Sequence, residues 1–365
     1  MWKHATAWLG WAILVAAAVN AQQPPEQLVR IPAAWTSSGT TYGTTDSLAA
    51  CATSDGRALV FATAKKAGRI DIFDANTGRF VGSHGCTGSA VGQFRHPNGV
   101  VAVRLPRSAS SGQSTSDVAA ILVVERDNAR VQAFWADDLG PAGCFGQAEL
   151  QRPYGGAAST RADGTYLYVT QADVPADRAV CIYRLTTAGA EISATFVRAF
   201  GDSSGRGVLH EAESVLVDDR MGRVLLCDED KRQRNVKVYT TDGTFTGQTF
   251  GDGLIAGDPE GLALFADGTG GFVIVTDQRK DITIWHVFDR RTYEHLGDFT
   301  GTPPIANTDG ICLYPQALGQ FTYGALFAVN NDADVHAYSL ADITRAVAAM
   351  RAAQQSERRP EAPDS

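Results

Sequence analysis

The sequence has no paired-cysteine motif, no excess of basic residues and no second long apolar run. Its 6 cysteines are spread singly along 365 residues, so the ligand spacing of a structural zinc site is missing. The formal net charge of −8 argues against a nucleic-acid partner, which needs a basic surface. Because no long apolar run follows the N-terminus, we expect the remaining chain to be soluble.

The N-terminus has the three parts of a secretory signal peptide. Lys3 and His4 form a basic start, Ala5–Val19 is apolar, and Val19-Asn20-Ala21 fits a cleavage site. The alternative is a membrane anchor, for which this apolar stretch is short. We therefore predict a signal peptide over residues 1–21 and export to the periplasm or the extracellular space.

A pattern of short apolar runs recurs through residues 46–345. In each unit a polar residue precedes one run, a turn follows, and a second run ends in further polar residues, before a third and often a fourth run. Six units follow at intervals of about 45–60 residues, and glycine is abundant, as turn-rich β proteins require. The first runs of the units are Ser47–Ala52, Val100–Val103, Gly156–Ser159, Ser214–Val217, Leu262–Phe265 and Ile311–Tyr314.

The repeat predicts an all-β fold, a six-bladed β-propeller over residues 22–345. We expect the polar lead-in, residues 22–42, to supply an edge strand that closes the ring. Residues 341–355 contain good helix formers, and we expect the last ten residues to be disordered, so residues 346–365 are assigned as a helical end and tail.

Polar residues flank the first two runs of every unit, and antiparallel pairing places them at one end of the ring. Acids dominate units four to six, where Glu213, Glu229, Glu260 and Asp309 occupy matching places. Carboxylates gather around cations, and hard oxygen ligands suit Ca²⁺ better than zinc. These four residues are therefore predicted to bind metal, whereas a lone Asp46 is equally well explained as a turn-forming residue.

Basic residues occupy the same end of units one and two. They are Lys65, Lys66 and Arg126, although a lysine pair alone is by default a solvated surface feature. A basic arc beside a metal-binding arc suits an anionic ligand, and phosphate is the natural candidate. A metal-bound water could then attack phosphorus while the basic groups offset charge on the phosphoryl oxygens.

Several short motifs, in order and at matching spacing, resemble the β-propeller phytases, which are secreted calcium-dependent phosphatases. The resemblance spans roughly residues 46–345. It is carried by Thr63-Ala-Lys-Lys-Ala-Gly68, Arg126, Tyr154-Gly155, Ala212-Glu213-Ser214 with Asp228-Glu229-Asp230, Asp258-Pro-Glu-Gly261, Gln278, Thr308-Asp309-Gly310 and Phe327-Ala328-Val329.

The resemblance implies roles for individual residues. It implies a calcium cluster built from Asp46, Glu213, Glu229, Asp258, Glu260, Gln278 and Asp309, and substrate contacts from Lys65, Lys66, Arg126 and Tyr154. Glu213, Glu229, Lys65 and Arg126 would then carry catalysis on phytate or a related phosphate ester. Where the family has a Lys-Glu pair after the second strand of the third blade, this chain has Gln171-Ala172.

A second resemblance leaves other functions open. Residues 92–103 look like an NHL repeat, and residues 145–158 are a weaker copy. Propellers of this kind include binding modules and metal-dependent lactonases, so a sugar-acid or lactone enzyme and a non-catalytic binding propeller remain alternatives. We expect a monomer with a small anionic substrate and no membrane contact after cleavage. Among the cysteines, Cys86 and Cys144 are the best candidates for a disulfide.

Overall fold

The computed structural model describes residues 28–38, 44–107 and 116–357, whose regular structure consists of strands apart from one helix and two short 3-10 turns. The predicted signal peptide, residues 1–21, and residues 358–365 of the predicted tail lie outside the described part. Strands form at nearly every apolar run expected from the sequence. The all-β prediction is therefore confirmed.

Four consecutive segments each form a four-stranded antiparallel sheet in simple chain order. The first contains β2 (Thr45–Ala52), β3 (Ala58–Ala64), β4 (Arg69–Asp74) and β5 (Phe80–His84). The second contains β8 (Pro97–Arg107), β9 (Ser116–Glu125), β10 (Arg130–Trp135) and β11 (Pro141–Phe145). The third contains β12 (Pro153–Arg161), β13 (Gly164–Gln171), β14 (Val180–Ala188) and β15 (Glu191–Phe200), and the fourth β16 (Ala212–Asp218), β17 (Arg223–Asp228), β18 (Asn235–Thr240) and β19 (Phe245–Phe250).

The remaining long strands form one eight-stranded sheet, in the order β20-β21-β22-β23-β1-β26-β25-β24. The N-terminal strand β1 pairs in parallel with β23 and antiparallel with β26. The lead-in therefore does form a strand, but this strand lies inside a sheet, where it joins the fifth and sixth repeats, and not at an edge as the sequence predicts. The members are β1 (Val29–Thr36), β20 (Leu262–Asp267), β21 (Gly270–Asp277), β22 (Ile284–Asp289), β23 (His295–Thr302), β24 (Ile311–Tyr314), β25 (Ala325–Asn330) and β26 (Asp334–Ser339). A separate pair is formed by β6 (Cys86–Thr87) and β7 (Gln93–Phe94).

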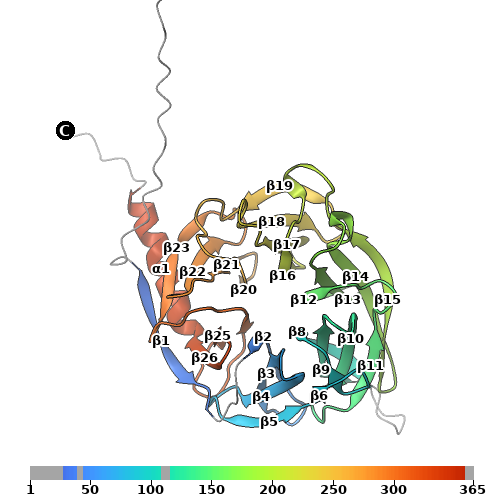
Figure 1. Ribbon diagram of the computed structural model, residues 1–365. Helices are drawn as coiled ribbons and strands as arrows, with labels where there is room; N and C mark the ends of the chain where they lie inside the picture. Colours follow the sequence, from blue (N-terminus) through green and yellow to red (C-terminus); the bar gives the residue numbers. More distant parts are fainter. Residues whose placement is uncertain (1–27, 39–43, 108–115, 358–365) are drawn as a thin grey trace, which may run out of the picture.

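The sheets stand side by side around a ring, in a propeller-like arrangement (Figure 1). The first strand of each repeat lies innermost and contacts the first strand of the next: β2 with β8, β8 with β12, β12 with β16, β16 with β20, β20 with β24, and β24 with β2. The ring of inner strands is therefore closed. Second and third strands are packed on both faces, and every residue of β3 and β10 is buried.

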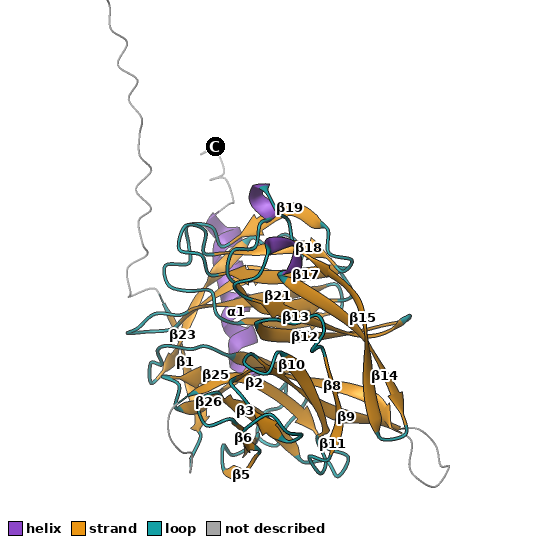
Figure 2. Ribbon diagram, turned by 45° about the vertical axis from the view of Figure 1, so that its right-hand side comes forward, coloured by secondary structure: helices purple, strands orange, loops and turns teal. Residues whose placement is uncertain are grey.

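The C-terminal helix α1 (Leu340–Glu357) lies along the outside of the eight-stranded sheet (Figure 2). Leu340, Ile343 and Val347 are buried against that sheet and anchor the helix to β1 and β23. The helix runs through the predicted boundary at residue 345 and includes Ser356, which we had expected in the disordered tail. Two short 3-10 turns, η2 (Ala176–Arg178) and η3 (Gly205–Gly207), complete the described elements.

Within the described ranges, no helix combines the length and the apolar character needed to cross a membrane. All six cysteines are free thiols, so the proposed bridge between Cys86 and Cys144 is not formed. Both are exposed, Cys86 on β6 and Cys144 on β11 of another sheet.

Candidate metal centre

A register shift near the start of an inner strand places one polar side chain at the centre of the ring. The pairing of β2 skips Asp46, that of β12 skips Tyr154, and that of β16 skips Glu213. Such a bulge turns a side chain out of the regular alternation of the sheet. The corresponding places in the six repeats are occupied by Asp46, Asn98, Tyr154, Glu213, Glu260 and Asp309.

A small residue follows each of these side chains, because the neighbouring backbone lies very close. A Cβ atom on Gly99 would lie 2.6 Å from the Tyr154 carbonyl oxygen, and one on Gly155 would clash with the Glu213 carbonyl. Thr170 Oγ1 donates to that same carbonyl (2.6 Å) and accepts from the Gly155 amide (2.9 Å). Backbone contacts between the third and fourth repeats therefore fix the backbone position of Glu213.

In every repeat but the first, where Ala64 ends the strand, the last residue of the second strand binds the loop that enters the repeat through its side chain. The carboxylate of Asp228 accepts from the His210 and Glu211 amides, both at 3.1 Å, and pairs with the buried Lys237 ammonium. Asp277 accepts from the Gly257 amide in the same way (2.6 Å). These acids have a structural role. The residue that follows the strand is Lys65, Arg126, Ala172, Glu229, Gln278 or Asn331 in chain order, and of these Lys65, Glu229 and Gln278 contact or adjoin the other predicted acids.

Three glutamates from neighbouring repeats converge on one point. One ligand oxygen each from Glu213, Glu229 and Glu260 lies within 4.8 Å of the others. Glu229 is only 8% exposed, and its Oε1 has no hydrogen-bond partner among the described residues. A buried carboxylate oxygen without a donor is costly, and here it faces two further carboxylates.

Burial and mutual repulsion oppose ionisation of this glutamate cluster. Burial, reinforced by the Asp46 charge, raises the pKa of Glu213 to about 8. Burial also raises the pKa values of Glu229 and Glu260 well above the usual range, with the neighbouring glutamates adding to the effect. A bound cation would reverse the balance, because opposite charge favours the ionised form.

A second group of charges adjoins the glutamates and is partly neutralised within itself. Lys65 Nζ lies 3.2 Å from Asp46 Oδ1 and 3.4 Å from Asp309 Oδ2. Gln278 Nε2 donates to the other oxygen of Asp309. Burial opposes the charge on Lys65, but the two aspartates outweigh it and raise its pKa. Burial, with Asp46 nearby, raises the pKa of Asp309 to about 6.

Two acids near this group depart from expectation. Asp258, a predicted metal ligand, has its side chain directed to Arg234, with Oδ1 3.3 Å from the guanidinium, and only its charge reaches the glutamate cluster. Asp332 was not predicted, yet it interacts with Asp309, and burial raises its pKa to about 6. It follows a strand end in a left-handed backbone conformation, so the sequence marks it only as a turn residue.

The predicted anion-binding residues lie on the adjoining repeats. The Arg126 guanidinium sits 6.0 Å from the centre of the Tyr154 ring and also contacts Asp127 (2.8 Å). Lys66 is exposed, and its ammonium forms no ion pair with the described residues. His96 was missed by the sequence reasoning: it lies 3.5 Å from Asp127, and its pKa is lowered by burial and by the positive charge of Arg126 and the two lysines.

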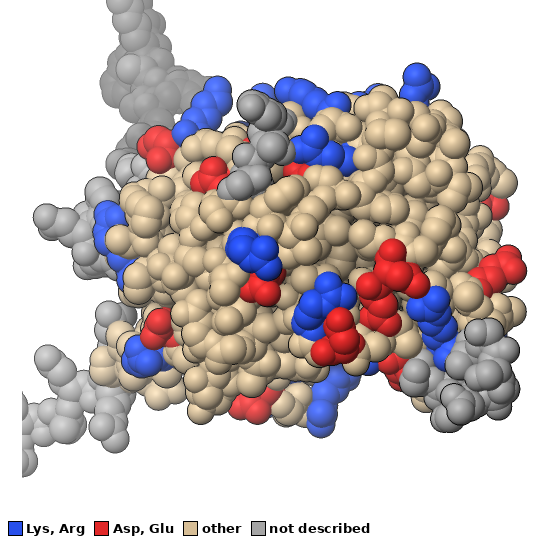
Figure 3. Space-filling model, turned by 90° about the horizontal axis from the view of Figure 1, so that it is seen from below, with Lys and Arg blue, Asp and Glu red and all other residues tan. Residues whose placement is uncertain are grey.

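The charges are therefore only partly segregated. The three glutamates form one cluster, Lys65 lies between Asp46 and Asp309 instead of apart from the acids, and Gln278 donates to Asp309. On the side of the molecule shown in Figure 3, by contrast, acidic and basic side chains lie interspersed.

Comparisons with known proteins add little at the level of sequence. No protein-family model matches the chain, and no curated protein matches it. Among solved structures, it is similar to a crystal structure of BBS1N in complex with ARL6DN (TM-score 0.48, 11% identity, covering 86% of this chain and 98% of that one). It is also similar to a Nidogen/Laminin complex (TM-score 0.46, 12% identity, 74% and 84% covered).

Proposed function

We propose that this protein is a calcium-dependent phosphomonoesterase, similar in its chemistry to the β-propeller phytases. The observation that carries the proposal is the buried, unpartnered Oε1 of Glu229 within a cluster of three glutamates. An isolated carboxylate of this kind is retained when a cation completes its surroundings.

The residues fit calcium in both donor type and spacing. Ca²⁺ binds six to eight oxygens at about 2.3–2.6 Å, so oxygens on opposite sides of one ion lie about 4.6–5.2 Å apart. The glutamate oxygens lie within 4.8 Å of one another and therefore fit the shell of a single ion. Glu213, Glu229 and Glu260 would hold it, with Asp309 and Gln278 adjoining. Bound calcium would supply Lewis-acid polarisation of a substrate oxygen.

The basic residues beside this centre would bind and orient the anion. Arg126 offers a planar fork of donors suited to phosphate, and its guanidinium packs over the face of the Tyr154 ring. Lys65 would balance phosphoryl charge from the edge of the metal centre, and the exposed Lys66 would add attraction without fixed geometry.

A second candidate function is a metal-dependent propeller enzyme acting on a sugar acid or lactone. Two observations favour it. Lys65 is already paired with two aspartates, and the third repeat has the uncharged Gln171-Ala172 where the phytases that the sequence resembles have a Lys-Glu pair. Both reduce the positive charge available to a phosphate. A non-catalytic binding propeller is the third possibility, since binding alone requires no reacting water.

We further propose a six-bladed propeller in which the eight-stranded sheet counts as two blades joined by β1. The closed order of inner-strand contacts supports this count. Export rests on the sequence of residues 1–21, and a monomer remains our expectation.

The direct test is phosphate release from inositol hexakisphosphate and from a simple aryl phosphate, with calcium and with excess chelator. We expect calcium-dependent release that Glu213→Ala and Lys65→Ala both abolish. Glu211→Gln is the matched control, because this exposed glutamate lies two residues from Glu213 but outside the cluster.

Absence of release from both substrates, while calcium still raises the melting temperature, would sink the phosphatase proposal but keep the metal centre. Hydrolysis of a panel of aldonolactones under the same conditions would then favour the second candidate. If calcium changes neither the melting temperature nor any activity, the metal centre itself is wrong.

A further inference from the structure

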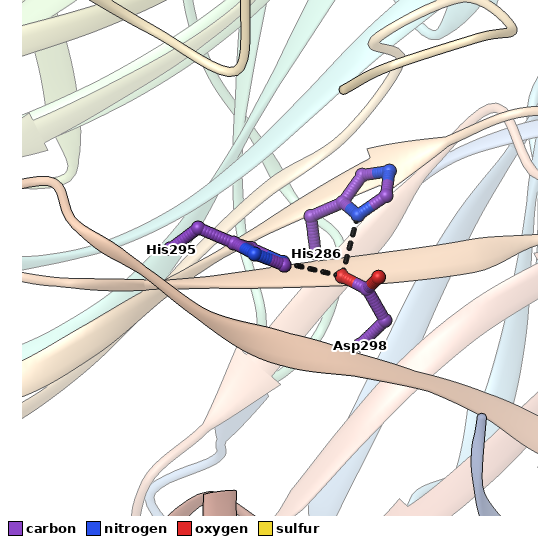
Figure 4. A group of neighbouring side chains, drawn as sticks. All are labelled: His286, His295 and Asp298. Carbon is purple, nitrogen blue, oxygen red and sulfur yellow. Dashed lines mark hydrogen bonds and ion pairs between the residues drawn. The ribbon is translucent and has the colours of Figure 1, made fainter. Parts of the chain in front are cut away.

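A second group of metal-ligating side chains lies between β22 and β23, away from the glutamate cluster. The rings of His286 and His295 both point to the carboxylate of Asp298 (Figure 4). Asp298 Oδ1 is 2.6 Å from His286 Nδ1 and 2.6 Å from His295 Nε2. We propose that these three residues form a binding site for a transition-metal ion of the zinc type, independent of calcium.

A bulge in β23 creates the convergence. His286 lies directly opposite Asp298, whereas the pairing shifts by one residue between Val287 and Phe288, so that His295 lies opposite Phe288. Residues three apart in a regular strand point to opposite faces of the sheet. The extra residue brings His295 and Asp298 to the same face as His286.

The same bulge recurs where third and fourth strands pair in the other sheets, so the bulge alone is not the signal. The signal is the set of residues placed around it. The residues at the position of His286 in the other repeats are Asp71, Gln132, Cys181, Lys237 and His336. The one other histidine, His336, lies opposite Thr36 and pairs with a single carboxylate, Asp334 of its own strand (Nε2 to Oδ2, 3.2 Å), whereas His286 lies between two carboxylates.

The outer surroundings of His286 are those of a metal ligand. Its second ring nitrogen, Nε2, lies 3.2 Å from Asp277 Oδ2. Metal-binding histidines commonly donate their other N–H to a carboxylate, which fixes the ring and raises its basicity. Asp277 is itself fixed by Arg279 and by the Gly257 amide. Asp277 therefore fixes the orientation of the His286 ring.

The donor set selects the class of metal. Two imidazole nitrogens and one carboxylate oxygen suit zinc and its neighbours, whereas calcium requires oxygen ligands. Zinc bonds of about 2.0–2.1 Å in tetrahedral geometry separate ligand atoms by about 3.3 Å, so the Asp298 oxygen need withdraw from each nitrogen by only about 0.7 Å.

Access and an open position complete the argument. His286 is 2% exposed, but the side chain of His295 is 30% exposed, so an ion can reach the group from solvent. Three protein ligands leave the fourth tetrahedral position to water or an added ligand.

The test is a titration of the full protein with Zn²⁺ by calorimetry, in saturating calcium, followed by the visible spectrum of the Co²⁺ form. We expect one zinc ion per chain and the intense bands of four-coordinate cobalt. His295→Ala and Asp298→Asn should each weaken zinc binding at least 100-fold, and Asp277→Asn should weaken it about 10–100-fold through His286. His336→Asn is the matched control and should leave affinity unchanged.

Each other result overturns the site. Zinc binding that survives both His295→Ala and Asp298→Asn, or a cobalt–thiolate charge-transfer band, would assign the ion to other groups such as the free cysteines. Absence of binding by a protein that still binds calcium would show that the three side chains form only a hydrogen-bonded cluster. Because the glutamate variants should not change zinc affinity, failure here and failure of the calcium centre are distinguishable.

Discussion

Asp228 and Glu229 are neighbours in sequence, yet they have opposite relations to their surroundings. Asp228 is fully buried and accepts hydrogen bonds from two loop amides and from the Lys237 ammonium. Glu229 is almost as buried, but one oxygen has no donor, and the nearest charges are carboxylates. A buried acid with all its donors supports the fold, and one without them requires something that the chain does not supply.

The largest effect should come from removing the satisfied acid. Asp228→Asn leaves the fully buried Lys237 without its counter-charge, and we expect a loss of about 3–5 kcal/mol in the free energy of unfolding, measured in urea. Asp230→Asn breaks a pair with the fully exposed Arg232 and should cost far less, because solvent screens exposed ion pairs. If both variants lost the same free energy of unfolding, the buried ion pair would not differ in its contribution from the exposed one.

The unsatisfied acid should behave in the opposite way. Glu229→Gln removes one charge from the cluster, so the variant should be at least as stable as the parent in chelator. With calcium at 100 times its Kd, the parent should gain about 2.7 kcal/mol and the variant almost nothing. Thermal melting with and without calcium measures both changes, and a variant that still gains the full amount would contradict the assignment.

The backbone contact behind Glu213 should have an intermediate effect. A Cβ at Gly155 meets the Glu213 carbonyl, so Gly155→Ala should cost about 1–3 kcal/mol and weaken calcium binding by displacing that strand. Gly82→Ala, where a Cβ meets nothing within 4 Å, should change stability by less than about 0.5 kcal/mol. Calorimetry of calcium binding to the two variants separates the local effect from a general loss of stability.

The pH dependence of the metal-free protein tests the same glutamate cluster without any substitution. The pKa of Glu213 rises from 4.5 to about 8 in the folded state, so folding favours the protonated form. The resulting stability is complete below pH 4.5 and is lost as the pH rises through 8. In chelator, the melting temperature should fall by roughly 2–4 °C per kcal/mol lost over this window, and calcium should restore it. A flat profile in chelator would contradict the pKa assignment.

The sequence predicted the strands well because the repeat determines them locally. Apolar runs between turn residues located the first three strands of each repeat, and the polar lead-in forms the expected strand, although inside a sheet instead of at an edge. The repeat also indicated that Glu213, Glu229 and Glu260 would lie close together, because Glu213 and Glu260 stand at the start of first strands and Glu229 follows a second strand. Such positions can be predicted from the repeat alone, because they do not depend on contacts between distant segments.

What the sequence did not predict depends on contacts between distant segments. The pairing of Lys65 with Asp309 joins residues 244 apart, and that of Asp258 with Arg234 depends on two loops. His96 and Asp332 stand in turns, where their residue types are ordinary. His286, His295 and Asp298 converge because of a bulge, which shifts the register by one residue without a distinctive local signal.

The strand β1 has a consequence for how the protein is made. It is synthesised before the sheets, but its partners β23 and β26 are among the last strands to be completed. Until β1 is inserted between them, β23 and β26 present unpaired edges in the middle of what becomes the eight-stranded sheet, and such edges invite association with other chains. The insertion of β1 therefore comes late, and any factor that delays it prolongs the exposure of those edges.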